Sequence, residues 1–119
     1  MALVSEQHAF LQDVAKLLQK AEELGFIVTG GELFRTPDQQ AIYVKSGRSQ
    51  TMSSKHLMRL AIDLNIFLKK EDGSLSLTYD IPILKPLGDF WEQLTPGQNS
   101  WGGNWRTFKD VPHFERRTA

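Results

Sequence analysis

Nine consecutive residues, "LAIDLNIFL" at positions 60–68, constrain the fold more than any other feature of the chain. Leucine or isoleucine occupies every second position, and the intervening positions include Asp63 and Asn65. Strict alternation of this kind is typical of a β-strand with one face against a core. We therefore predict a sheet with one covered face, and we expect Asp63 to point away from the leucine and isoleucine side chains.

Two segments that precede this strand have the pattern of helices. Residues 5–24 repeat apolar side chains at steps of three and four, which predicts an amphipathic helix that ends at Gly25. Residues 36–47 predict a second helix, because Thr36 suits the N-cap and Pro37 suits the first helical position. Helices packed on a small antiparallel sheet make an α+β fold, which is the fold class we expect.

Shorter segments complete the prediction. Residues 26–30 are a short run rich in β-branched side chains, and two consecutive glycines end it at positions 30 and 31. This pattern predicts a strand that leads into a loop. An Asp-Gly turn at 72–73 predicts a hairpin whose second strand lies within residues 74–79. Prolines interrupt the next stretch, so a helix is expected there only from about Lys85. The segment "PHFE", residues 112–115, is predicted to be a short final strand.

Length and composition exclude several classes of protein. A chain of 119 residues fits one domain, which we expect to span positions 1–119. Fourteen basic residues balance fourteen acidic ones without a basic run, which argues against nucleic acid as a partner. No run approaches the roughly 20 apolar residues of a membrane span. The N-terminal segment lacks a basic n-region, so we expect no secretory signal and a protein that is first held in the cytoplasm.

The absence of cysteine restricts any transition-metal site to His, Asp and Glu ligands. Of the three histidines, His8 lies among polar residues of the first predicted helix and is expected at the surface. His56 and Asp63 would lie about 23 Å apart in an extended chain, and one helix would still separate them by about 10 Å. They can share an ion only if the chain turns between them, and Asp110 and His113 can join only if the two stretches meet.

The spacing of these residues resembles that of a known enzyme family. The string S-x-H-x-x-x-x-A-x-D is followed some fifty residues later by D-x-x-H. The matching residues are Ser54, His56, Ala61, Asp63, Asp110 and His113. This pattern is similar to that of the zinc peptidases that cut peptidoglycan stem peptides. They comprise D-alanyl-D-alanine carboxypeptidases and the L-alanyl-D-glutamate endopeptidases of phage endolysins, and they share the Hedgehog/DD-peptidase fold.

The resemblance implies a role for each matching residue. His56, Asp63 and His113 would be the ligands of a Zn²⁺ ion, and Asp110 would be the general base. Arg35 would hold the substrate or stabilise the oxyanion, although it could equally be an ion-pair partner of Glu32 or Asp38. At the position where the family commonly has glycine, three residues after the first histidine, this chain has Arg59. Trp101 and Trp105 are expected in the core rather than in the catalytic set.

The function that the resemblance implies is an L-alanyl-D-glutamate endopeptidase of the phage or prophage endolysin type, a hydrolase active in host cell lysis. A D-alanyl-D-alanine carboxypeptidase is the alternative, and an inactive wall-binding or virion protein of the same fold is a second one. The intact set of four site residues argues against the inactive protein. A Hedgehog-like signalling ligand is disfavoured by the absent cysteine and signal peptide.

The same resemblance sets the expected partners. The substrate is the peptidoglycan stem peptide, and we expect a monomer without nucleic acid or a membrane span. Without a signal peptide, such an enzyme would leave the host cytoplasm with the help of a holin, or enter with the virion, and act in the periplasm or cell wall.

Overall fold

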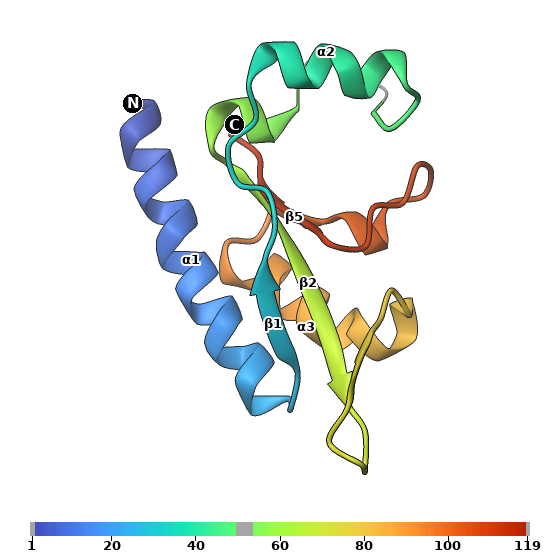
Figure 1. Ribbon diagram of the computed structural model, residues 1–119. Helices are drawn as coiled ribbons and strands as arrows, with labels where there is room; N and C mark the ends of the chain where they lie inside the picture. Colours follow the sequence, from blue (N-terminus) through green and yellow to red (C-terminus); the bar gives the residue numbers. More distant parts are fainter. Residues whose placement is uncertain (1, 50–53, 119) are drawn as a thin grey trace.

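The computed structural model describes residues 2–49 and 54–118, and it has the expected α+β architecture (Figure 1). The helices and strands are α1 (Leu3–Glu23), β1 (Ile27–Gly30), α2 (Pro37–Lys45), β2 (Ala61–Lys69), β3 (Leu75–Leu77), α3 (Ile81–Leu94), β4 (Asn99–Trp101) and β5 (His113–Arg116). Two short 3₁₀ helices, η1 (Lys55–Met58) and η2 (Gly102–Asn104), precede β2 and follow β4. In Figure 1, α1 runs beside β1, α3 lies behind the sheet and α2 crosses above its upper end.

The sheet is antiparallel and is built around β2, the strand predicted from the alternating pattern. Its strands lie in the order β1-β2-β5-β4, and β3 pairs with the far end of β2. The first residues of β2 pair with β5, in a register that sets Asp63 opposite His113. The later residues of β2 pair with β1 and, through the 72–73 turn, with β3. The β2–β5 register therefore brings together two residues that are fifty positions apart in the sequence.

The core lies between the sheet and the helices α1 and α3. Leu64 and Ile66 of β2 are almost fully buried, as the alternation predicts, whereas Asp63 lies on the opposite face. The partners that pack on these residues are apolar side chains of α1, α3, β4 and β5, among them Phe10, Leu17, Leu84, Leu87, Trp91, Trp101 and Phe114. Burial of this apolar surface orders β2 and β5, which carry two of the three candidate metal ligands.

Both predicted N-terminal helices are confirmed, with the expected end signals. The chain leaves α1 through Gly25, whose φ of +83° is a conformation that glycine adopts without steric cost. The Thr36 hydroxyl caps α2 by accepting a hydrogen bond from the Gln39 backbone N–H at 3.1 Å. Among the residues that the structure describes, no helix combines the length and the apolar character needed to cross a membrane.

The predicted start of the third helix near Lys85 is wrong, because α3 begins four residues earlier at Ile81. The Asp80 side chain caps the helix by accepting a hydrogen bond from the backbone N–H of Ile83, the third helical residue. Pro82 lies in the first turn, where its missing N–H has no intrahelical partner to lose. Pro86 does forfeit one helical hydrogen bond, but the helix continues because it buries an apolar face of Leu84, Leu87 and Trp91.

Candidate metal centre

The chain makes a tight turn between His56 and β2. His56 and Asp63 could share a metal ion only if the chain turned between them, and it does. His56 lies in η1, and the next residue after η1, Arg59, has φ +56° and ψ +37°. This left-handed conformation reverses the chain so that His56 Nε2 lies 3.2 Å from Asp63 Oδ1. Left-handed backbone favours glycine, the residue that the resemblance led us to expect at this position. Here Arg59 adopts it instead, with its guanidinium 4.2 Å from the ring centre of Phe34.

The β2–β5 pairing supplies the third candidate ligand. His113 faces Asp63 across the ladder, and its Nδ1 lies 3.3 Å from Asp63 Oδ1. The two imidazole rings are 5.0 Å apart and inclined at 72°. One ligand atom from each of His56, Asp63 and His113 lies within 4.8 Å of the other two. The two stretches therefore do meet, and they bring all three predicted ligands to one point.

The inner atoms of this cluster lack hydrogen-bond partners. His56 Nε2, Asp63 Oδ1 and His113 Nδ1 are buried and lie close together. None of the contacts between them has the geometry of a hydrogen bond. The outer nitrogens are occupied, since His56 Nδ1 lies 3.0 Å from the Leu33 carbonyl and His113 Nε2 lies 2.7 Å from Glu115 Oε1. Buried polar atoms are normally satisfied, and metal-binding imidazoles usually donate their outer N–H to a carbonyl or carboxylate. The donor set therefore fits a divalent metal ion.

The charges of the cluster depend on one another. Burial alone would raise the pKa of Asp63, but the two neighbouring imidazoles outweigh it and hold the pKa well below its usual range. Burial alone would lower the pKa of His113, but Asp63 and Glu115 outweigh it and raise the pKa to about 9. A metal ion at this point would replace the proton that His113 otherwise carries near neutral pH.

Asp110 lies beside this cluster rather than within it. Its Oδ2 is 3.8 Å from His113 Nδ1, and burial raises the pKa of its carboxyl, with a further contribution from the charge of Asp63. The Asp110 backbone is held by hydrogen bonds from its N–H to the Gly102 carbonyl and from the His113 N–H to its carbonyl, each 3.1 Å long. A carboxyl next to the metal position with a raised pKa has the properties of a general base.

Arg35 reaches the same region from the loop before α2. Its guanidinium forms an ion pair with Glu32, donates to Gln40 Oε1 at 2.7 Å and packs on the ring of Tyr43 at 4.5 Å. The Arg35 backbone N–H donates to the His56 carbonyl at 3.2 Å. The ion pair with Glu32, one of the structural alternatives, is therefore present, while Arg35 also lines the pocket above the metal ligands. Its catalytic role stays a prediction.

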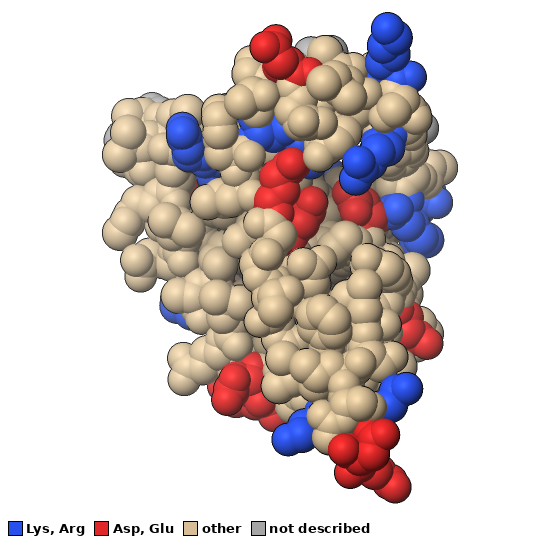
Figure 2. Space-filling model, in the orientation of Figure 1, with Lys and Arg blue, Asp and Glu red and all other residues tan. Residues whose placement is uncertain are grey.

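The cluster lies in an open pocket of about 830 Å³ between α2 and η1 on one side and the 105–112 segment on the other. In Figure 2 acidic side chains gather in a hollow below α2, with lysine and arginine side chains around its edge. Trp101 is fully buried, as expected, but Trp105 is only partly buried and lines this pocket.

The sequence interpretation did not assign Glu115 a place beside His113. The alternation H-x-E on a strand sets two side chains on one face and could have indicated it.

Comparisons with known proteins agree with this geometry. The sequence pattern of a family described as D-alanyl-D-alanine carboxypeptidase matches residues 47–116, more than half of the chain and the part that contains His56, Asp63, Asp110 and His113. The chain belongs to this family, which confirms the resemblance to the peptidoglycan peptidases.

Two curated relatives and one solved structure are similar to the chain. The L-alanyl-D-glutamate peptidase of Listeria phage A118 is 35% identical over 105 residues, which cover 84% of this chain and 34% of the relative. The chain thus spans about a third of the length of that relative. The peptidoglycan L-alanyl-D-glutamate endopeptidase CwlK of Bacillus subtilis (strain 168) is 29% identical over 141 residues, with 97% of this chain and 76% of the relative covered.

The crystal structure of the Serratia marcescens L-Ala D-Glu endopeptidase ChiX superposes with a TM-score of 0.65 at 26% identity, and the match covers 88% of this chain and 78% of that one. The fold class predicted from the sequence is therefore confirmed.

Proposed function

We propose that the protein is a zinc-dependent peptidase that hydrolyses the amide bond between L-alanine and D-glutamate in the peptidoglycan stem peptide. The observation that carries this proposal is the convergence of three unpartnered ligand atoms, from His56, Asp63 and His113, at the floor of an open pocket. Two imidazoles and one carboxylate are a donor set of catalytic zinc sites, which keep a further position open. The names of the two curated relatives and of the solved structure support the choice of bond.

The residues of the pocket have different roles in hydrolysis. His56, Asp63 and His113 would hold the zinc ion, which when bound polarises the substrate carbonyl and lowers the pKa of water. Asp110 takes a proton from the water whose oxygen attacks the carbonyl carbon. It then delivers that proton to the nitrogen as the carbon–nitrogen bond breaks, so that the amine leaves neutral. Arg35 lies where its guanidinium can hold the substrate or stabilise negative charge on the carbonyl oxygen.

A D-alanyl-D-alanine carboxypeptidase is the second candidate, and the description of the matching family favours it. Digestion of purified peptidoglycan, followed by mass spectrometry, separates the two. An L-alanyl-D-glutamate endopeptidase exposes new D-glutamate N-termini, whereas the carboxypeptidase releases free D-alanine. Release of reducing sugars without new amines would contradict both, because it would show cleavage of glycan rather than peptide.

We further propose that residues 1–119 act as one peptidase domain and as a monomer. The proposed substrate lies in the cell wall, so an enzyme of a lytic phage would reach it from the host cytoplasm with a holin. Lysis from within by the protein with and without a co-expressed holin tests this route.

A further inference from the structure

The charged side chains that line the pocket are mostly paired within the protein. Arg35 is paired with Glu32, and Arg117 Nε lies 2.6 Å from Glu115 Oε2. Lys109 directs its ammonium group to two carbonyl oxygens of its own segment, at 3.2 Å to Gly103 and 2.6 Å to Trp105. These contacts fix the walls of the pocket and occupy part of the donor groups of the three cations.

Two further pocket cations have no such partner. Among the described residues, neither Arg48 nor Lys55 forms an ion pair, and the side chain of neither donates to a carbonyl group. The guanidinium of Arg48 packs on the ring of Tyr43 at 4.6 Å, and its backbone N–H is anchored to the Tyr43 carbonyl at 2.8 Å. Lys55 immediately precedes His56 in η1. Both cations therefore line the pocket with their donor groups available.

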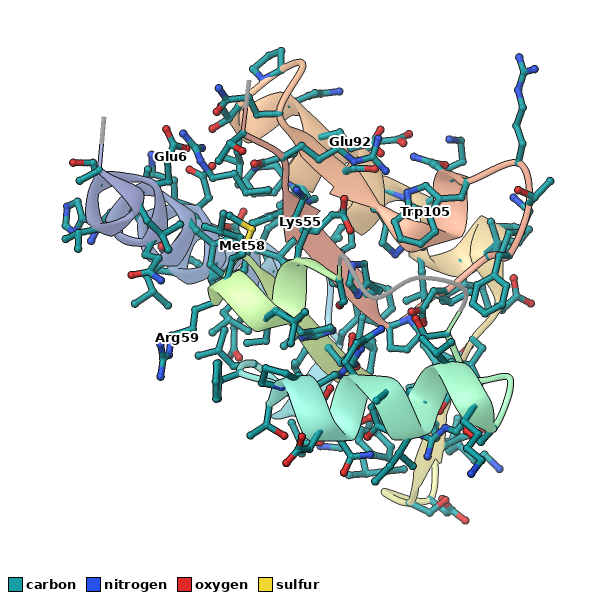
Figure 3. The ribbon with its side chains drawn as sticks, turned by 90° about the horizontal axis from the view of Figure 1, so that it is seen from above. Glu6, Lys55, Met58, Arg59, Glu92 and Trp105 are labelled. Atoms are coloured by element: carbon teal, nitrogen blue, oxygen red, sulfur yellow. The ribbon has the colours of Figure 1, made fainter. Side chains whose placement is uncertain are left out.

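The side chains of Lys55 and Arg59, the two cations at the ends of η1, point in different directions. Figure 3 shows Lys55 extending from η1 back over the molecule, whereas Arg59 extends outward from it. Lys55 lines the pocket and Arg59 does not. The two residues are thus cations at the start and just past the end of one 3₁₀ helix, and only one of them faces the site.

The charge balance of the pocket favours an anionic ligand. Once the internal pairs are set aside, Asp63 and Asp110 are the remaining acidic groups of the pocket, with Asp63 at the candidate metal position and Asp110 beside it. A divalent cation there balances their two negative charges, so Arg48 and Lys55 keep uncompensated positive charges in the pocket, as does Lys109, whose ammonium group is held by carbonyl oxygens. Uncompensated charge in a concave site attracts ligands of opposite sign.

The substrate of the proposed function carries the matching group, and this step rests on that function. Glutamate has two carboxyl groups, and the continuing stem peptide can use only one of them. The other is a free carboxylate, within a few bonds of the nitrogen that leaves, unless it is amidated. We propose that Arg48 and Lys55 bind this free carboxylate, and that they make the enzyme selective for stem peptides whose glutamate is not amidated. The planar guanidinium of Arg48 can bind a carboxylate through two parallel hydrogen bonds.

Paired synthetic stem peptides test the inference, one with the free carboxylate of D-glutamate and one with the corresponding amide. The zinc-loaded wild-type protein should cleave the free acid with a kcat/KM about tenfold to a hundredfold higher, the usual worth of a charge-assisted hydrogen bond. Arg48→Gln and Lys55→Gln should each reduce this ratio, mainly through KM for the free acid, and the double variant should abolish it. The matched control is Arg59→Gln, which removes a cation of the same turn outside the pocket and should keep the wild-type ratio.

The ratio of the two peptides distinguishes recognition from damage to the fold. A variant that merely unfolds or loses zinc cleaves both peptides less and leaves their ratio unchanged, so zinc content and thermal unfolding are measured in parallel. Equal cleavage of both peptides by the wild-type protein overturns the inference while leaving the proposed function intact. A preference that survives in the double variant overturns it as well. Cleavage of neither peptide overturns the proposed function itself, and the inference falls with it.

Discussion

Glu115 Oε1 lies 2.7 Å from His113 Nε2, on the side of the imidazole that faces away from Asp63. Burial would raise the pKa of the Glu115 carboxyl, but His113 and Arg117 outweigh it and lower that pKa, so Glu115 is a carboxylate at neutral pH. A carboxylate at Nε2 keeps a proton on that nitrogen and turns the Nδ1 lone pair toward His56 and Asp63. Glu115 therefore orients His113 for metal binding without touching the metal position.

Replacement of Glu115 should weaken metal binding rather than abolish it. Glu115→Gln keeps an oxygen that can accept from Nε2–H but removes the negative charge, so zinc affinity should fall by roughly tenfold to a hundredfold. Competition with a chelator of known affinity measures the change. Arg117→Gln is the matched control, because it removes only the exposed partner of Glu115 and should have a smaller effect. Unchanged affinity in Glu115→Gln would show that Glu115 serves the fold alone.

Substitutions at Asp110 and His113 should have different effects, because a general base and a metal ligand make different demands. His113→Ala should lose zinc, since it removes one of three converging ligand atoms. Asp110→Asn should keep zinc and fold while losing roughly 10² to 10⁴ in rate, the usual worth of general acid–base catalysis. Metal analysis and peptide cleavage on the same samples measure both. If Asp110→Asn sheds zinc as readily as His113→Ala does, Asp110 is a ligand and the two roles are wrongly divided.

Zinc uptake should release a proton near neutral pH. In the metal-free protein the pKa of His113 is raised to about 9, above its unfolded value of about 6.5. The protonated imidazole therefore stabilises the metal-free fold fully below pH 6.5, and this contribution disappears as the pH rises through about 9. Metal binding must displace the same proton, so zinc affinity should increase with pH across this interval. Titration calorimetry in buffers of different ionisation enthalpy counts the released protons, and their absence would contradict the assignment of His113.

Local patterns predicted the elements of the fold better than their limits and contacts. The alternation in residues 60–68 set both the strand and the face of Asp63, because a strand has only two faces. The start of α3 was missed since the cost of Pro86 is local, whereas the apolar face that outweighs it is formed by tertiary packing.

The candidate site was found through its spacing, not through its geometry. The left-handed turn at Arg59, which joins His56 to Asp63, is not evident from an arginine in the sequence. The cation contacts of Tyr43 depend on how the loops fold over α2, and no periodicity encodes them. By contrast, the H-x-E alternation at Glu115 was visible in the sequence and needed only the β5 assignment to be interpreted.

Gly102 should be required for the position of Asp110, although it is remote from the chemistry. A Cβ atom at residue 102 would lie 2.1 Å from the Asp110 carbonyl oxygen, which is backbone and cannot rotate away. Gly102→Ala should therefore displace the segment that holds Asp110 and lower the free energy of unfolding by about 1–3 kcal/mol, the usual cost of overpacking. The matched control is Gly30→Ala, where the added methyl group meets nothing within 4 Å. Chemical denaturation and peptide cleavage of both variants check this. A Gly102→Ala protein as stable and active as Gly30→Ala would show that the close approach of Gly102 and Asp110 does not position the base.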